Sequence, residues 1–376
     1  MRLLRSLAAV FVVLLALAGV VVGVLVASTP SPIAARALAM GPAPRLDELP
    51  RVEGWSASCV VSGRDDLVGP EDLERDPWGR LYTGLHDGRI VRLLPQRDGS
   101  LRSETVARAA GRPNGVTADP DGSLLVSYDY GEPGKRIDRD GRVHALDWLT
   151  GADAAIGRDG TLYHPHLAPW KRTGTVGVDF GLVLLEAAHD GELRATHPAT
   201  GRSVTLATGL FLPDGVALSE NEDFVLVGEF GAARITRVWL RGPQAGRQEP
   251  LIENLPGLPD GLASDGRGTF FVALPVLRSA LLDWLQARPR LKELAARLAV
   301  RIGPRLMTGV PAPGAKGTSA VLAFDESGRI MRVYVDATGV VGPMITTVVP
   351  AGPHLYVSSL MGFGVARCAR EPAGGP

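Results

Sequence analysis

Cysteine, aromatic residues and unbalanced charge are scarce in this chain, and each shortage excludes a class of protein. Two Cys and seven His in 376 residues form no cluster with metal-ligand spacing, so no zinc site is expected. The formal net charge is zero and no basic stretch interleaves with aromatic residues, which excludes the usual footprint of nucleic-acid binding. Glycine and proline are abundant instead, with 46 and 29 residues, and 45% of the chain is hydrophobic. This composition is typical of a turn-rich globular β protein.

A turn motif recurs in front of short apolar strands. Such turns punctuate β-hairpins, and they stand at Asp76–Gly79, Asp119–Gly122, Gly157–Gly160 and Asp265–Gly268. The repeating units begin near residues 71, 114, 152, 214, 260 and 345, a spacing that suits four-stranded propeller blades with insertions. We therefore predict an all-β fold, a six-bladed β-propeller over residues 51–370. A β-sandwich is the alternative, but it gives no reason for a polar residue at a constant distance from each turn.

Such a polar residue is present in most of the units. The position is held by Glu71, Asn114, Asp214 and Asp260. Ala152 leaves it without a side-chain oxygen, unless the strand start shifts by one residue to Asp153. In a propeller, equivalent positions point at one spot on the central axis, where carboxylates repel one another unless a cation lies between them. Because carboxylate and amide oxygens suit Ca²⁺, the sequence predicts a calcium site made by the four polar residues, although each alone is also an ordinary turn residue.

Two histidines are candidate general bases. The loop after each second strand should lie on the same face as the calcium site, and one such loop reads His164-Pro165-His166. An imidazole can activate water near neutral pH, and a calcium-polarised carbonyl would then be attacked in ester or lactone hydrolysis. Asp214 and Asp260 join this catalytic set, since a carboxylate that is partly free of the ion can orient the water. A surface histidine beside a proline often has no such role.

The amino terminus carries a long apolar run. Leu7 to Ala27 has no charged residue and, at a rise of about 1.5 Å per residue, spans roughly the hydrocarbon core of a bilayer. Arg2 and Arg5 precede it, which predicts a single-pass membrane protein with the propeller on the extracytoplasmic side. Cleavage near Ala27 or Ala39, as in a signal peptide, is the alternative. The predicted parts are an anchor or signal sequence (1–28), a linker (29–50), the propeller (51–370) and a disordered tail (371–376).

The two cysteines, Cys59 and Cys368, stand at opposite ends of the predicted propeller. Propellers usually close by pairing an amino-terminal strand with the last blade, so the two thiols could meet there. In an oxidising compartment we predict a disulfide, which on the disputed chain-entropy model would stabilise the fold by up to about 5 kcal/mol. Two unrelated buried thiols are the alternative.

Residues 275–317 interrupt the fifth unit. Apolar residues recur there at helical spacing, and Arg288-Pro289 breaks the pattern, so two short amphipathic helices are expected. As a lid over the site, the helices imply an apolar substrate, whereas as a basic pair they imply docking on the membrane that holds the anchor. The third alternative is that they pack on the propeller and have no further role.

Several longer motifs occur together along the propeller. They are Gly69–Asp72, Tyr82–Arg89, Leu212–Ser219, Glu222–Val227, Ala233–Arg237, Glu253–Asp260 and Leu282–Leu285. With these motifs the chain resembles the strictosidine synthase-like proteins, which include the adipocyte plasma membrane-associated proteins, over roughly residues 67–370. That family lies within the wider group of gluconolactonases, senescence marker proteins and paraoxonases.

The resemblance implies a six-bladed propeller, often with an amino-terminal anchor. In the hydrolase branch it also implies a central calcium, whose ligands correspond to the four polar residues above. Two segments depart from the family pattern: Ala152-Asp153-Ala154 replaces Asn-Asp-Leu, and His164-Pro165-His166 replaces the Thr-Asp-Ser of many relatives. The glutamate on which the namesake synthase relies has no counterpart in Phe270–Pro275, so synthase activity is the least favoured function.

The predicted function is that of an exported, membrane-anchored propeller hydrolase of the arylesterase or lactonase type. It would act on a small apolar ester or lactone and use a central Ca²⁺ ion. The alternative is a non-catalytic binding propeller, in which the ion is structural or absent and the helices receive a partner or lipid. No nucleic-acid partner is expected.

Overall fold

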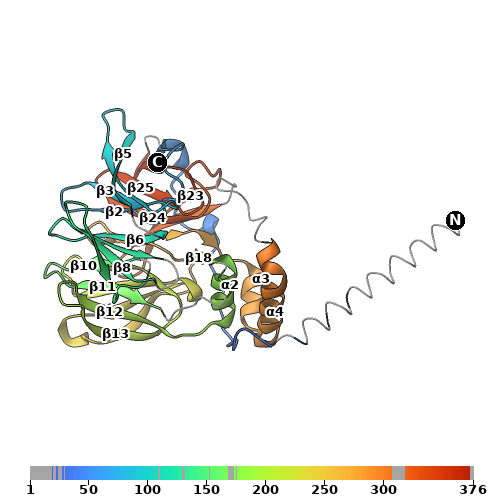
Figure 1. The fold of residues 1–376 in the computed structure, drawn as a ribbon. Coiled ribbons are helices and arrows are strands. Elements are labelled where there is room, and N and C mark those ends of the chain that lie inside the picture. Colours follow the sequence, from blue (N-terminus) through green and yellow to red (C-terminus); the bar gives the residue numbers. More distant parts are fainter. Residues whose placement is uncertain are drawn as a thin grey trace, which may run out of the picture. The chain divides into compact units, whose positions relative to one another are not determined.

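The structure is a computed structural model that describes residues 30–108, 111–128, 132–151, 153–167, 173–174, 176–306 and 318–372, with positions 19, 23 and 28. Six four-stranded antiparallel sheets follow one another along the chain as the blades of a β-propeller (Figure 1). The predicted six-bladed propeller is confirmed. Its innermost strands begin within three residues of the predicted unit starts.

In the first three blades, the strands follow chain order from the innermost to the outermost. Blade one consists of β2 (Glu74–Arg75), β3 (Leu81–Gly84), β4 (Arg89–Pro95) and β5 (Leu101–Arg108). Blade two consists of β6 (Pro113–Ala118), β7 (Leu124–Tyr128), β8 (Gly134–Ile137) and β9 (Val143–Leu146). Blade three consists of β10 (Ala155–Ile156), β11 (Leu162–His166), β12 (Gly191–His197) and β13 (Arg202–Leu210).

The remaining blades follow the same order until the last one takes its outermost strand from the amino-terminal side. Blade four consists of β14 (Pro213–Leu218), β15 (Phe224–Glu229), β16 (Arg234–Trp239) and β17 (Gln248–Ile252). Blade five consists of β19 (Leu262–Ser264), β20 (Thr269–Leu274), β22 (Ser319–Asp325) and β23 (Ile330–Asp336). Blade six consists of β24 (Ile345–Ala351), β25 (His354–Ser359), β26 (Val365–Ala369) and β1 (Val60–Ser62). A separate ribbon pairs β18 (Gly257–Leu258) with β21 (Val276–Leu277).

Apolar side chains fill the spaces between consecutive blades. Between blades one and two, for example, Ile90, Val116 and Val126 are buried in one cluster. The second strand of each blade is buried along most of its length because a neighbouring blade covers each of its faces, and every residue of β15 is buried. These strands therefore read as continuous apolar runs in the sequence.

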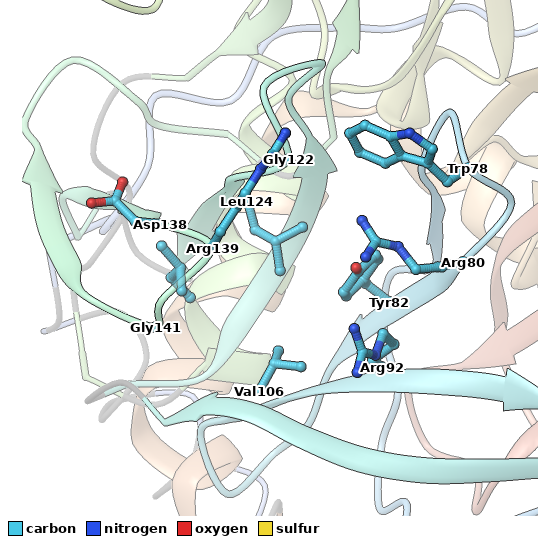
Figure 2. Close-up of a pocket in the computed structure, with 11 residues that line it drawn as sticks. Trp78, Arg80, Tyr82, Arg92, Val106, Gly122, Leu124, Asp138, Arg139 and Gly141 are labelled. Carbon is cyan, nitrogen blue, oxygen red and sulfur yellow. The ribbon is translucent and has the colours of Figure 1, made fainter.

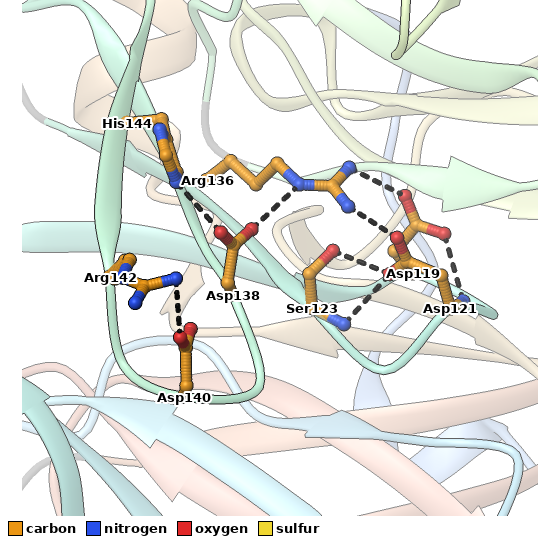
Figure 3. Close-up of polar contacts among 8 residues, drawn as sticks. All are labelled: Asp119, Asp121, Ser123, Arg136, Asp138, Asp140, Arg142 and His144. Carbon is orange, nitrogen blue, oxygen red and sulfur yellow. Dashed lines mark hydrogen bonds and ion pairs between the residues drawn. The ribbon is translucent and has the colours of Figure 1, made fainter.

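Charged side chains fasten the hairpin turns of blade two (Figure 3). The first turn closes with a hydrogen bond from Gly122 N–H to the Asp119 carbonyl oxygen at 2.8 Å, and the positive φ of Gly122, 88°, suits glycine. Arg136 of β8 contacts the Asp121 carboxylate in this turn and donates from Nε to Asp138 Oδ1, 3.2 Å away, in the next turn. Arg136 therefore ties the two turns together.

The ring closes in blade six, where β1 pairs with β26. Cys59 directly precedes β1, and Cys368 lies in β26. Their sulfur atoms are bonded, and the two Cα atoms lie 4.0 Å apart although 309 positions separate them in the sequence. The covalent bond and the strand pairing thus hold the same two ends of the propeller.

Three α-helices lie outside the blades in the part of the chain that the structure describes. α3 (Ala280–Gln286) and α4 (Pro289–Leu306) interrupt blade five between β20 and β22, and the break between them falls where Arg288-Pro289 predicted it. α2 (Val176–Glu186) interrupts blade three between β11 and β12 and was not predicted. Together with residues 30–39, the helices form a compact unit, named the helical unit here, with a small core of Ile33, Val178, Leu182 and Ala296.

The predicted anchor, Leu7 to Ala27, lies outside the described residues except for positions 19 and 23, and so does the predicted tail from residue 373 onward. Among the helices of the described segments, none has the length and apolar composition needed to cross a membrane. Part of the predicted linker, residues 30–39, belongs to the helical unit, where Arg36 N–H donates to the Glu186 carbonyl oxygen at 2.8 Å.

Reduction of the disulfide is expected to destabilise the propeller. Its loss frees the two ends that it holds in blade six, so the free energy of unfolding should fall by about 2–5 kcal/mol. Urea unfolding with and without dithiothreitol, followed by tryptophan fluorescence, measures this change. A Cys59→Ser/Cys368→Ser variant should unfold at the urea midpoint of the reduced protein, and dithiothreitol should not change that midpoint. Equal midpoints for the oxidised and reduced wild-type protein would contradict the expectation.

Candidate site at the propeller axis

The predicted ligands lie at the starts of innermost strands. Asn114 and Asp214 fall within β6 and β14, where each strand has a β-bulge against its neighbour, and Glu71 and Asp260 stand just before β2 and β19. A similar bulge occurs in β24 at Thr346. A bulge changes the direction of a side chain and is common next to functional sites. The repeat in the sequence thus corresponds to a repeated irregularity of the backbone.

The carboxylates at the axis are close enough to repel one another. Burial raises the pKa of Glu71 well above its usual value, and the Asp260 carboxylate raises it further, while the Arg112 guanidinium opposes the shift. Burial also raises the pKa of Asp260, with added repulsion from Asp214 and Asp153. The axis therefore gathers more negative charge than its surroundings stabilise, which favours bound protons or a bound cation.

Two further carboxylates join consecutive blades. Asp72 Oδ2 accepts a hydrogen bond from Val116 N–H of blade two at 2.7 Å, and Asp153 Oδ2 accepts one from Val216 N–H of blade four at 3.0 Å. Asp72 and Asp153 are therefore equivalent to each other. Asp153 does not shift to supply the oxygen that Ala152 lacks, and Ala152 itself lies outside the described residues.

Blade six holds the backbone of Glu71 and leaves its carboxylate free of these contacts. Thr346 Oγ1, Thr347 Oγ1 and Ser358 Oγ all donate to the Glu71 carbonyl oxygen, at 2.6, 3.2 and 3.0 Å. The Glu71 side chain is buried, and its Oε2 has no hydrogen-bond partner among the described residues. A buried carboxylate oxygen without a donor is unfavourable, so this atom is well placed to accept a ligand.

The chemistry of this donor set fits a hard cation. Three carboxylates and the Asn114 amide offer oxygen atoms, which Ca²⁺ prefers. Within the described segments, no three His, Cys, Asp or Glu side chains lie close enough together to hold one metal ion. In this arrangement a cation at Glu71 would bind at most one further carboxylate, and the Asn114 amide, backbone oxygens and water would complete its coordination.

His164 is packed inside blade three. It lies in β11 and not in a loop, with 1% of its surface exposed. Its Nε2 is 2.9 Å from Thr196 Oγ1 of β12, and burial lowers its pKa to about 4. This histidine is neutral at physiological pH, and its ring is engaged by the neighbouring strand.

His166 ends the same strand and is half-buried. Its Nδ1 lies 2.7 Å from Thr150 Oγ1, which fixes the ring. The end of a second strand faces the start of a first strand: in blade four, Glu229 at this place pairs with Pro213, next to Asp214. Of the two predicted bases, His166 has the exposure and the position that contact with a substrate at the axis requires.

His86 is a third histidine on this face, and the sequence pattern did not predict a role for it. It lies in the loop after β3, and this loop of blade one corresponds to the end of β11 in blade three. The His86 ring lies so close to Gly69 that a side chain at position 69 would collide with it. Burial lowers the pKa of His86 to about 4, and Arg112 lowers it further. The same arginine acts on Glu71, which places His86 near the axis cluster. Its place within the Tyr82–Arg89 motif was the sequence signal that could have identified it.

A separate pocket of about 350 Å³ lies between blades one and two (Figure 2). Hairpin turns at the opposite end of the strands from the axis carboxylates contribute Trp78 and Gly122 to it. Two of its arginines already have carboxylate partners, since Arg80 lies 2.5 Å from Asp76 and Arg92 lies 2.8 Å from Glu104. The residues that line it include none of the predicted ligands or bases.

Comparisons with known proteins agree with this architecture. Residues 58–93 match the family described as strictosidine synthase-like, N-terminal, and residues 176–243 match the family described as strictosidine synthase. The adipocyte plasma membrane-associated protein of Homo sapiens is 30% identical over 324 residues, which cover 78% of this chain and 74% of that protein. Strictosidine synthase-like 13 of Arabidopsis thaliana is 28% identical over 307 residues, which cover 73% and 74%.

Solved structures show the same fold at lower sequence identity. A gluconolactonase from Xanthomonas campestris aligns with a TM-score of 0.57 and 14% identity, over 91% of this chain and 99% of that one. Regucalcin from Agrobacterium tumefaciens, described as a calcium-binding protein, aligns with a TM-score of 0.52 and 15% identity, over 82% and 92%. The fold and the axis cluster thus define a six-bladed propeller of the strictosidine synthase-like class. Within that class, the chain belongs to the family of the adipocyte plasma membrane-associated proteins.

The hydrogen bond between Asp153 and blade four is expected to be worth more to stability than the charge of Asp153. Asp153→Ala leaves the Val216 N–H without its acceptor, whereas Asp153→Asn keeps an oxygen in place and removes the repulsion. The alanine variant should therefore be less stable than the asparagine variant by about 1–3 kcal/mol in urea unfolding. Equal stability of the two variants would show that the bond between the blades contributes nothing.

In protein freed of divalent cations, the free energy of unfolding is expected to fall as the pH rises from 7 to 8. Burial raises the pKa of Glu74 to about 8 and that of Glu71 well above its usual value, so the folded protein holds protons that the unfolded chain has released. Loss of those protons as the pH rises removes stability. Below pH 7 the trend is opposed by His86 and His164, with pKa values of about 4, because the unfolded chain binds their protons.

Urea midpoints in EGTA at pH 7, 7.5 and 8 measure this dependence. Glu71→Gln removes one of the responsible groups and should reduce the slope. A midpoint that stays constant or rises over this interval would contradict the electrostatic account of the axis.

Proposed function

We propose that this protein is an exported, membrane-anchored hydrolase that acts on a small apolar ester or lactone at the propeller axis. The observation that carries the proposal is the buried Glu71 carboxylate, whose Oε2 has no hydrogen-bond partner among the described residues and whose protonation state depends on Asp260. A buried acidic group of this kind is common in active sites and rare elsewhere. The structural likeness to a gluconolactonase supports the fold alone, and the chemistry depends on these residues.

A calcium ion would be held by Glu71 and Asn114 together with Asp214 or Asp260. When bound, such an ion supplies Lewis-acid polarisation of a substrate carbonyl. The carboxylate that does not contact the ion would orient a water molecule, and His166 would accept its proton. Thr150 fixes the His166 ring through Nδ1, which leaves Nε2 for this transfer.

Three observations support the proposed compartment. The apolar run from Leu7 to Ala27 has the length of a membrane span. The human relative is named for its association with the plasma membrane. The bonded pair Cys59 and Cys368 suits an oxidising compartment, since disulfides are rare in the cytosol. Together they support a single-pass anchor with the propeller on the extracytoplasmic side.

A non-catalytic binding propeller is the second candidate. It is favoured by the lack, among the described residues, of three acidic or histidine side chains gathered closely enough for one metal ion. In that case the axis cluster would bind a structural ion or protons, and no substrate would be turned over.

The full-length chain, purified in detergent with Ca²⁺, is expected to hydrolyse at least one member of a panel of phenyl acetate and aliphatic lactones. EGTA and Asp260→Ala should each abolish turnover, and His166→Gln should lower kcat/KM by about 10²- to 10⁴-fold, the usual contribution of a general base. His144→Gln is the matched control, because His144 lies on the outer strand β9 and pairs with Asp138.

Calorimetric titration with Ca²⁺ separates the two candidates. Calcium binding without turnover on any substrate would favour the binding propeller. Hydrolysis that persists in EGTA and in Asp260→Ala would contradict the calcium site and leave another group responsible.

A further inference from the structure

Exposed apolar side chains are concentrated on α3 and α4. Among the described residues, ten large apolar side chains are exposed, and five of them lie on these two helices. The other five stand singly on the propeller, as scattered apolar residues usually do. The concentrated set, named the apolar face, consists of Leu281, Trp284, Leu291, Leu294 and Leu298, with exposed fractions from 36% to 73%.

The apolar face is not the side of α4 that packs on the helical unit. Leu291, Leu294 and Leu298 recur three and four residues apart and form one stripe along the helix. The other side of α4 is already satisfied, because Lys292 and Ala296 are fully buried in the helical unit. One face of α4 therefore packs in the core of the helical unit, and a second, apolar face is exposed.

Basic residues surround the apolar face. Apart from the buried Lys292, residues 280–301 contain four arginines and two acidic residues, a net charge of +2, whereas the whole chain has a net charge of zero. The Arg288 guanidinium lies 4.1 Å from the centre of the Trp284 ring, and Arg290, two residues further along the chain, is exposed. Leucine and tryptophan on one side of a helix, with arginine beside them, are typical of helices that lie in a membrane interface.

The chain that leaves the predicted anchor is fixed to these same helices. Ile33 belongs to the core of the helical unit, and Lys292 Nζ of α4 donates to the Arg36 carbonyl oxygen at 2.5 Å and to Gln286 Oε1 at 2.9 Å. Five residues lie between Ala27 and Ile33, and the six Cα-to-Cα steps of an extended chain span at most about 20 Å. An inserted anchor thus keeps the helical unit within about that distance of the bilayer.

We propose that α3 and α4 dock in the plane of the membrane that holds the anchor. The apolar face enters the interface between headgroups and acyl chains, and the arginines contact the phosphates of anionic phospholipids. The proposal rests on the membrane anchor of the proposed function and not on the hydrolase activity. In the described part of the chain, no helix is long and apolar enough to span a bilayer.

A single environment-sensitive label tests the docking in the full-length protein. The two native cysteines are bonded to each other, so Leu294→Cys supplies the one reactive thiol for an NBD fluorophore. Val204→Cys is the matched control, because Val204 is an exposed apolar residue on β13 of the propeller. Both proteins are reconstituted into phosphatidylcholine vesicles with and without phosphatidylglycerol and recovered by flotation. The Leu294 label should shift to the blue and be quenched by spin-labelled phospholipid, most strongly with phosphatidylglycerol, and the Val204 label should do neither.

The arginines are tested in the same assay. Arg288→Gln and Arg290→Gln should each lower the ratio of docked to undocked protein about fivefold in anionic vesicles and little in neutral ones. A Leu294 label that stays in water in floated vesicles overturns the docking but not the anchor. A blue-shifted label that spin-labelled lipid does not quench also overturns it, because the label is then buried against protein and not in lipid. A chain that fails to float with the vesicles overturns the anchor and the docking together.

Discussion

Hydrogen bonds between the starts of consecutive blades determine where the other groups at the axis lie. Asp72 and Asp153 each accept an amide of the following blade, and three hydroxyl groups of blade six hold the Glu71 carbonyl oxygen. These bonds fix the backbone from which Glu71, Asp214 and Asp260 extend. Because the backbone is held by other groups, the three carboxylates can stay close together in spite of their repulsion. The fold thus maintains a concentration of negative charge that the side chains alone would disperse.

Structure and chemistry are divided between adjacent positions in this arrangement. In blade one, Asp72 joins the blades and its neighbour Glu71 presents a carboxylate to the axis. In blade three, Asp153 likewise joins two blades through a hydrogen bond, whereas Ala152, at the neighbouring position, has no side-chain oxygen. The absence of a side-chain oxygen at position 152 therefore does not interrupt the bonds between the blades. The equivalent positions of a propeller can change their chemistry one blade at a time without loss of the fold.

The sequence predicted the propeller well because its signals are local. Turn residues, short apolar strands and a constant offset are visible within a dozen positions, and they located six blades and the starts of their innermost strands. The roles of Asp72 and Asp153 were not visible, because the amides that they bind lie 44 and 63 residues away. His164 looked like a loop residue beside a proline, but pairing with β12 draws it into the sheet. Helix α2 interrupts a blade where no turn motif marks it.

The disulfide has a mechanical consequence. A force applied between the two ends of the chain reaches Cys59 and passes through the disulfide to Cys368, so the blades between the two cysteines are bypassed. The blades cannot be unzipped one after another from either end. The same force would first extend the chain ahead of Cys59, where residues 30–39 cross the helical unit. A tension sensed at the amino terminus would thus detach that segment from α2 and α4 while the axis of the propeller stays closed.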